Sequence, residues 1–294
     1  MDCTIAANYL INGLVVVQIR PNELHVWHFN DELVREPSPL KSYAQSLSDD
    51  ERQRYNKFRF EHHRHQFLVA HGALRQLLSK YVPEISAHQW KFKTNKFGKP
   101  SIANERLPYP LEFNLSHTPG NIAFVIANGL QSGIDVEANS RQIGDPEIIQ
   151  QVFSASEHEQ FSNLSKNEKQ SFFLSIWTLK EAYVKALGAG LQMTLTDLSF
   201  ELNKTGSIIF DSGSPPEVKP EYWNFFYLTK TRTHTISLAA LAKHSDKKIE
   251  VKMFDARPEH HTQKPYRSVS GCSQMQAQTF HREQKANIQP AIFR

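Results

Sequence analysis

Residues 177–185 read WTLKEAYVK and lie inside a run from 171 to 187 that predicts a single helix ending at Gly188. One set of apolar side chains follows the alternating three- and four-residue spacing of a helix face, as expected for a helix packed on a core. A second apolar set falls on the opposite side at about 100° per residue. The first set is Phe172, Ile176, Leu179, Tyr183 and Ala186, and the second is Phe173, Trp177 and Val184. We therefore expect this helix to lie between other elements.

Glu181 falls among the second apolar set of this helix. A carboxylate buried there costs on the order of several kcal/mol unless something pairs with it. Lys185, one turn further on, is one candidate partner, and a metal ion is another. The alternative is that Glu181 and Lys185 form an exposed pair that contributes only about 0.3–0.5 kcal/mol. The helix taken alone leaves both interpretations open.

Asp135 and Glu137 lie two residues apart on a predicted strand, so their side chains project from the same face. Two carboxylates at this spacing repel each other unless a cation lies between them. An exposed strand face is the alternative, but Ile134 and Val136 alternate to the opposite face as buried residues do. If Glu181 joins the pair, three carboxylates converge, which suits Mg²⁺, a hard cation that also binds substrate phosphates. This set predicts phosphate chemistry.

Ser116 and His117 follow a predicted strand at 111–115 and are expected in a loop, where polar side chains reach ligands. A serine–histidine hydrolytic pair is disfavoured, because neighbouring residues at a strand end point apart and no glycine-flanked nucleophile motif surrounds Ser116. Phosphate contacts suit both residues better. Lys180 and Lys185 could likewise neutralise phosphate oxygens, although a solvated side chain is the alternative for Lys180.

A long helix followed by antiparallel strands occurs twice along the chain, with the helices predicted at 65–81 and 171–187. Strands are predicted at 14–19, 23–29, 90–93, 111–115, 122–127, 133–137, 198–202, 207–210, 223–228 and 234–241. The sequence thus predicts an α+β protein of two similar lobes, 1–130 and 131–243, each a long helix packed on a small antiparallel sheet. A ligand cleft is expected where the lobes meet.

Two segments are expected to be irregular. Pro37 and Pro39 predict a loop after the second strand. Residues 244–294 are polar with few spaced apolar side chains, and we expect a basic, irregular tail because this segment buries too little apolar surface to offset the entropy of ordering.

The charge and composition exclude several classes of protein. Residues 244–294 hold nine Lys or Arg and five Asp or Glu, against 34 and 30 in the whole chain, so the remainder is electrically balanced. Nucleic-acid binding is therefore disfavoured. The longest apolar run, 10–19, is shorter than the roughly 20 residues that a membrane span needs, and no secretory signal is visible. With two cysteines far apart, we expect a cytoplasmic protein that does not act at a membrane.

Four motifs occur in order along the chain: GKP at 98–100, FNLSH at 113–117, GIDVE at 133–137 and WTLKEAYVK at 177–185. Together they resemble the motif set of the Sfp-type 4′-phosphopantetheinyl transferases, over about 46–242. The resemblance implies a pseudo-twofold fold with coenzyme A and Mg²⁺ bound between the lobes. Such an enzyme, a transferase of the holo-[acyl-carrier-protein] synthase type, moves phosphopantetheine from coenzyme A to a serine of an apo acyl or peptidyl carrier protein and releases adenosine 3′,5′-bisphosphate. Because both lobes lie in one chain, we expect a monomer.

The resemblance also implies roles for individual residues. Asp135, Glu137 and Glu181 match the metal-binding acids, and Glu181 is also a candidate base for the carrier serine. Lys185 matches a lysine on the α-phosphate side of the pyrophosphate. Ser116 and His117 match residues that contact the coenzyme A phosphates, Gly98, Lys99 and Pro100 match the loop that borders the adenine, and Lys180 matches a further position of the family motif.

This sequence departs from the family in the residues expected to bind the 3′-phosphate of coenzyme A. Family members usually supply basic residues to it from their first helices, and here Gln66 stands where an arginine is expected. The remaining candidates are Arg52, Arg54, Lys57 and Arg64.

Two other functions fit parts of the pattern. A Mg²⁺-dependent phosphodiesterase or nuclease also uses three acids and a lysine, but it would transfer the phosphoryl group to water and would modify no protein. A module that binds carrier proteins or coenzyme A without catalysis would tolerate the loss of all three acids. The intact motif set disfavours the non-catalytic module, and the acceptor of the phosphoryl group, a carrier serine or water, separates the two enzymes.

Overall fold

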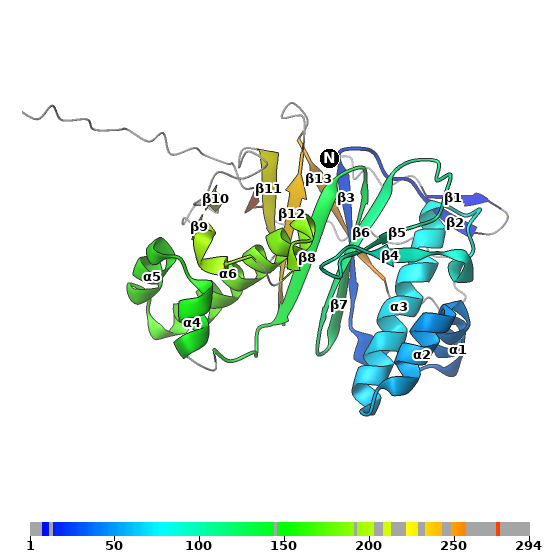
Figure 1. The fold of residues 1–294 in the computed structure, drawn as a ribbon, viewed down its shortest axis with the longest axis horizontal. Coiled ribbons are helices and arrows are strands. Elements are labelled where there is room, and N and C mark those ends of the chain that lie inside the picture. Colours follow the sequence, from blue (N-terminus) through cyan, green and yellow to red (C-terminus); the bar gives the residue numbers. More distant parts are fainter. Residues whose placement is uncertain are drawn as a thin grey trace, which may run out of the picture.

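The computed structural model describes residues 8–11, 14–143, 146–190, 193–202, 208–212, 222–228, 233–242, 248–256 and 275–276. Two four-stranded sheets lie at the centre, and one long helix covers the outer face of each (Figure 1). Helix α3 (Glu61–Tyr81) packs on the first sheet and helix α6 (Lys166–Leu187) on the second. The inner faces of the two sheets pack against each other through a third apolar cluster.

The first sheet has the strand order β13-β3-β7-β6 and the second the order β14-β11-β12-β8. The first contains β3 (Glu23–Phe29), β6 (Leu111–Thr118), β7 (Asn121–Asn128) and β13 (Glu250–Asp255). The second contains β8 (Gln131–Ala138), β11 (Trp223–Leu228), β12 (His234–Leu241) and β14 (Met275–Gln276). All pairs are antiparallel except β13 with β3. The predicted α+β architecture of two helix-on-sheet lobes is confirmed, with this one parallel pair in addition.

Smaller elements surround the two sheets. Three two-stranded sheets pair β1 (Asn8–Ile11) with β2 (Leu14–Val17), β4 (Phe92–Thr94) with β5 (Pro100–Ile102), and β9 (Ser199–Leu202) with β10 (Ile208–Asp211). The shorter helices are α1 (Pro37–Ser46), α2 (Asp49–Lys57), α4 (Pro146–Val152) and α5 (Ala155–Ser162). No helix among the described residues is both long enough and apolar enough to cross a bilayer.

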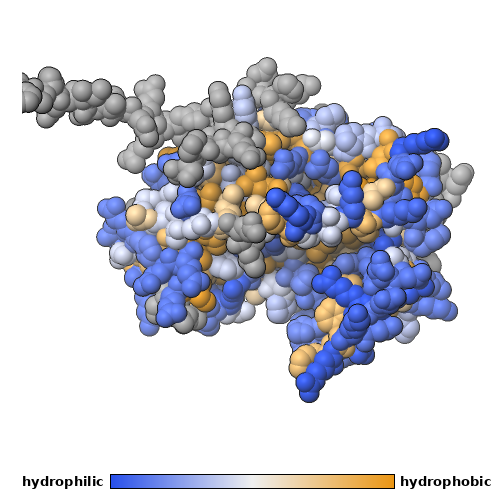
Figure 2. Space-filling view, viewed as in Figure 1, coloured by the Kyte–Doolittle hydropathy of each residue, from blue (hydrophilic) through white to orange (hydrophobic). Residues whose placement is uncertain are grey.

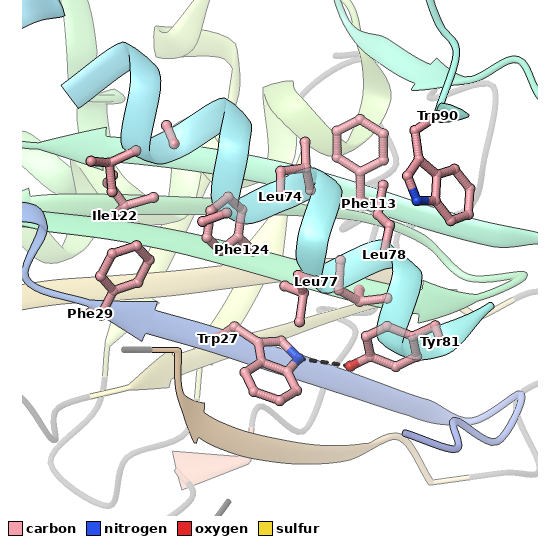
Figure 3. Packing of buried hydrophobic residues seen from close by; sticks show 14 of the residues in the cluster. Trp27, Phe29, Leu74, Leu77, Leu78, Tyr81, Trp90, Phe113, Ile122 and Phe124 are labelled. Carbon is pink, nitrogen blue, oxygen red and sulfur yellow. Dashed lines mark hydrogen bonds between the residues drawn. The ribbon is translucent and has the colours of Figure 1, made fainter. Parts of the chain in front are cut away.

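The core of the first lobe is built from aromatic and aliphatic side chains between α3 and the first sheet. Figure 3 shows Leu74, Leu77 and Tyr81 of the helix facing Trp27 and Phe124 of the strands. The Trp27 indole nitrogen donates a hydrogen bond of 2.7 Å to the Tyr81 hydroxyl, so the one polar group of this buried ring has an acceptor. This packing holds α3 against the outer face of the sheet that contains β6.

Helix α6 begins and ends with local signals. Ser165 and Glu168 form a capping box at its start, and Gly188 ends it in the left-handed conformation at φ 67°. The predicted end at Gly188 is therefore confirmed, and the start lies five residues before the predicted one. Phe173 and Val184 are buried together with Ile176 and Leu179, which confirms that the helix has two apolar sides.

Gly133 sets how closely α6 approaches β8. A Cβ atom at Gly133 would lie 2.1 Å from the Ala182 carbonyl oxygen and 2.4 Å from the Ala186 nitrogen. Both are backbone atoms of α6, so the helix would have to move away from the strand that carries Asp135. The glycine of the GIDVE motif is thus required by packing.

Gly133→Ala is expected to destabilise the fold by about 1–3 kcal/mol, the usual cost of overpacking a core. Thermal or denaturant unfolding measures this change. Ser132→Ala on the same strand is the matched control, because the Ser132 hydroxyl is buried and has no hydrogen-bond partner among the described residues. Equal stability of the two variants would contradict the close contact.

Three predictions of irregular or terminated structure were wrong. Pro37 and Pro39 lie in the first turn of α1, where a missing backbone N–H costs nothing. Strand β6 continues to Thr118, because Ser116 and His117 pair with Ala123 and Ile122 of β7. Residues 250–255 of the predicted tail form β13, in which Val251, Met253 and Phe254 are buried. Most of 257–294 lies outside the described residues.

Candidate active site

The site begins where the edge strands of the two sheets meet, β6 from the first and β8 from the second. Side chains of β6 accept hydrogen bonds from backbone N–H groups on the edge of β8. The Asn114 side-chain oxygen accepts from the Ile134 nitrogen at 2.9 Å, and the Ser116 hydroxyl accepts from the Val136 nitrogen at 3.4 Å. Because alternate residues of a strand share a face, this contact aligns Ser116 with the carboxylates of β8.

Ser116, Asp135 and Lys185 form one hydrogen-bonded cluster. The Ser116 hydroxyl donates to Asp135 Oδ1 at 2.9 Å, and Lys185 Nζ donates to the same oxygen at 2.6 Å and to Ser116 Oγ at 2.8 Å. Asp135 is 4% exposed. Its second oxygen, Oδ2, is buried without a hydrogen-bond partner among the described residues. An unsatisfied buried carboxylate oxygen is costly, and it is available to a cation.

Glu137 and Glu181 complete the group of acids. Burial raises the pKa of both carboxyls, and the negative charge of Asp135 raises each pKa further. Arg141, four residues after Glu137, forms an ion pair with it. The Arg141 Cζ atom also lies 4.8 Å from the centroid of the Trp177 ring. The structure therefore brings the three predicted acids into one electrostatically coupled group.

The donor set fits a hard cation, although it is not preassembled. Carboxylate oxygens are what Mg²⁺ prefers, and Asp135 Oδ2 has a free acceptor site. Within the part of the chain that the structure describes, no three Asp, Glu, His or Cys side chains are gathered as a ready metal site. In this structure Lys185 pairs with Asp135, and Arg141 pairs with Glu137. These carboxylates would have to turn toward a shared ion.

A cavity of about 840 Å³ opens beside this cluster. Helix α6 lines it with Trp177, Glu181 and Lys185, and residues 148, 150–152 and 193–196 line another part of it. The turn 97–100 lies across the end of the cavity at Gly188 and Gly190. Figure 2 shows a mostly hydrophilic face that is hollowed between the two lobes.

The GKP turn is held by side-chain hydrogen bonds. The Asn95 side-chain oxygen accepts from the nitrogens of Phe97 and Lys99, both at 2.9 Å, and Gly98 has φ 87°, which favours glycine. Lys99 Nζ donates to the Ala186 carbonyl at 2.7 Å, at the C-terminal end of α6. Gly98, Lys99 and Pro100 all line the cavity, but the Lys99 ammonium is engaged by the helix end, and their contact with coenzyme A stays a prediction.

His117 points away from Ser116. It lines a second cavity of about 800 Å³ with His62, His63 and Gln66 at the start of α3. Burial lowers the His117 pKa, and the positive charge of Lys185 lowers it further. The prediction that these neighbours point apart is consistent with strand alternation.

Matches to known proteins agree with this geometry. The model of the 4′-phosphopantetheinyl transferase superfamily matches 131–239, and that of the 4′-phosphopantetheinyl transferase N-terminal region matches 36–129. The 4′-phosphopantetheinyl transferase HetI of Nostoc sp. is 37% identical over 172 residues, which cover 58% of this chain and 70% of the relative. The chain belongs to the 4′-phosphopantetheinyl transferase superfamily.

Two other similar proteins extend the comparison. The transferase Sfp of Bacillus subtilis is 28% identical to this transferase over 176 residues, covering 59% of this chain and 75% of Sfp. The crystal structure of holo-[acyl-carrier-protein] synthase from Thermotoga maritima is 24% identical with a TM-score of 0.31, covering 38% of this chain and 63% of that one. The two family models and the matches to HetI and Sfp confirm the Sfp-type resemblance in the sequence.

Two residues predicted to bind coenzyme A are engaged elsewhere in the transferase. Lys180 is fully buried, and its ammonium contacts Glu157 and two backbone carbonyls. Arg64 donates to Glu61 at 3.0 Å and to the Phe58 carbonyl at 2.8 Å, so it ties α2 to α3. The roles of both residues in binding coenzyme A stay predictions, and the sequence alone did not reveal the protein acceptors that each side chain meets.

Thr118 and Arg141 are site residues that the sequence analysis missed. The Thr118 hydroxyl donates to Glu137 Oε2 at 3.4 Å, and Arg141 pairs with the same carboxylate. A signal existed for Thr118, since it follows Ser116 at the spacing that puts both on one strand face. Arg141 follows the end of β8, so strand alternation could not predict which way its side chain points.

The raised pKa of Glu181 predicts a pH-dependent stability in metal-free protein. A carboxyl whose pKa is raised in the folded state binds its proton more tightly there than in the unfolded chain. The resulting stability is fully present below the ordinary pKa and is lost as the pH rises through the raised pKa. Glu181→Gln removes this titration. The Tm of the variant should therefore equal that of the parent at about pH 4 and be higher than that of the parent at about pH 8. Thermal unfolding in EDTA tests this, and a difference in Tm that does not change with pH would contradict it.

Proposed function

We propose that this transferase moves the 4′-phosphopantetheinyl group from coenzyme A to a serine of an apo acyl or peptidyl carrier protein. The observation that carries the proposal is that Glu181 and Lys185 line the cavity between the lobes, while Lys185 also hydrogen-bonds Ser116 and Asp135, in a chain of this family. One chain supplies both lobes, so we propose that it acts as a monomer.

Each described group has a place in this reaction. The carrier serine oxygen bonds to the phosphorus of the phosphopantetheinyl group, and the pyrophosphate P–O bond breaks to release adenosine 3′,5′-bisphosphate. Glu181 accepts the serine proton as the serine oxygen attacks. Lys185 faces the negative charge that develops on the leaving phosphate.

Asp135, Glu137 and Glu181 are the residues that would hold Mg²⁺. The free acceptor site of Asp135 Oδ2 and the raised pKa values of the other two acids support this assignment. A bound Mg²⁺ would supply further positive charge to the pyrophosphate oxygens. Lys185, which neutralises Asp135 in this structure, would then be free to contact phosphate.

Intact-protein mass spectrometry tests the proposed reaction directly. An apo acyl carrier protein is incubated with this protein, coenzyme A and Mg²⁺, with EDTA and boiled-enzyme controls. We expect a mass gain equal to phosphopantetheine that EDTA prevents. Hydrolysis of coenzyme A without a change in carrier mass would favour the phosphodiesterase alternative, and binding of coenzyme A without any product would favour the non-catalytic module.

A further inference from the structure

Lys180 and Glu157 form a fully buried ion pair that the proposed reaction does not use. Both side chains are 0% exposed, and Lys180 Nζ lies 2.5 Å from Glu157 Oε2. Burying two charges is expensive even when they are paired, and well-packed apolar residues often replace such pairs without loss of stability. Stability alone therefore does not explain the pair.

All three N–H groups of the Lys180 ammonium have acceptors. Besides Glu157, they donate to the Val152 carbonyl at 2.6 Å and to the Leu195 carbonyl at 2.9 Å. Val152 is the last residue of α4, where exposed helix carbonyls favour a cation. Leu195 is the first residue of a short 3₁₀ helix, Leu195–Asp197. A single side chain of α6 thus holds two separate segments.

Glu157 extends the same connection. Its Oε2 accepts from the Ser154 nitrogen at 2.8 Å and its Oε1 from the Phe200 nitrogen at 2.7 Å. The carboxylate therefore joins the start of α5 to β9 while it pairs with Lys180. Every oxygen and nitrogen of this pair is used to fix one segment against another.

The segments that Lys180 holds line the same cavity as Glu181. Their apolar lining residues are Ile148, Val152, Met193 and Leu195, and Gln150, Gln151, Thr194 and Thr196 line it beside them. On α6, Lys180 lies beside the face that carries Trp177, Glu181 and Val184 into the same cavity. The ammonium thus holds this part of the lining against the helix that carries Glu181.

We infer that Lys180 is a positioning residue that, through Glu157 and the carbonyls of Val152 and Leu195, fixes the two lining segments whose apolar side chains contact the uncharged part of coenzyme A. The inference rests on the proposed function. Lys185 is the group assigned to the charged phosphates, so the uncharged part of the ligand is left for Ile148, Val152, Met193 and Leu195. Contacts to a part of the ligand that does not react are the same in the ground and transition states, so their loss raises KM and leaves kcat unchanged.

The test compares variants that separate folding from positioning. Lys180→Met leaves the Glu157 charge buried and unpaired, and this variant is expected to unfold readily. The double variant K180M/E157Q removes both charges, keeps one side-chain oxygen that can accept from the Ser154 or the Phe200 nitrogen, and still removes the donors to Val152 and Leu195. Lys166→Met, at the exposed start of the same helix, is the matched control.

For the double variant we expect KM for coenzyme A to rise roughly tenfold, which corresponds to about 1.4 kcal/mol of binding free energy. The kcat value and the KM for the carrier protein should stay near those of the Lys166→Met control. A folded double variant with an unchanged KM for coenzyme A would overturn the inference, because a purely structural role changes only the amount of active protein. Absence of transfer by the wild type would instead refute the proposed function.

Hydrogen exchange of the wild type provides a readout that does not depend on any variant folding. Coenzyme A should slow exchange at 148–152 and 193–196 and leave β10 unchanged. Unchanged exchange at both lining segments when coenzyme A is bound would also overturn the inference.

Discussion

Replacing Glu181 with Gln is expected to abolish phosphopantetheine transfer while leaving the fold intact. Gln has nearly the same shape and removes only the negative charge and the ability to accept a proton. Because burial and Asp135 already raise the Glu181 pKa, loss of the charge relieves electrostatic repulsion. The same change removes one oxygen ligand from the proposed metal site and the proposed base, so kcat should fall by about 1,000-fold or more.

The carrier-mass assay and thermal unfolding, run on the same preparation, measure the two halves of this prediction. Glu159→Gln, an exposed glutamate on α5, is the matched control and should transfer at the parental rate. Substantial transfer by a folded Glu181→Gln variant would exclude Glu181 as both metal ligand and base. Loss of activity together with a lower Tm at neutral pH would point to a structural role.

Periodicity predicted the layers of the fold because the two long helices bury continuous stripes. The two apolar sides of α6 and its end at Gly188 follow from local spacing and from a residue that adopts positive φ without strain. Strand β13 was missed for a different reason. It is a short segment in a polar region, and its burial depends on pairing with β3, more than two hundred residues earlier. Such a long-range partner leaves no local signal.

The acids of the site were predictable because strand alternation put Asp135 and Glu137 on one face and the helix pattern placed Glu181 among apolar residues. Lys180 shows where that reasoning fails. It is the direct neighbour of Glu181 in sequence, yet a rotation of about 100° along the helix directs it to Glu157. Lys180 donates to carbonyls of α4 and the 3₁₀ helix, and Glu157 accepts from the N-cap residue of α5 and from β9, so only the folded chain reveals the cluster.

Replacing Lys185 with Met is expected to lower kcat by about 100- to 1,000-fold, the usual effect of removing one group that stabilises developing charge. The variant also removes the counter-ion of Asp135, whose Oδ1 accepts from Lys185 Nζ at 2.6 Å. Breaking a buried ion pair destabilises a protein, but Lys185 is 29% exposed, so solvent screening reduces the effect. Metal-free protein should therefore lose a moderate amount of stability.

Excess Mg²⁺ separates the two roles of Lys185. If the ion binds Asp135, it replaces the missing counter-ion and should restore the Tm of Lys185→Met toward that of the parent. It should not restore kcat, because the ammonium that faces the leaving phosphate is still absent. Lys166→Met, on the same helix, controls for loss of charge alone. Recovery of both Tm and kcat at high Mg²⁺ would show that Lys185 acts only by neutralising Asp135, and the proposed contact with the pyrophosphate would then be wrong.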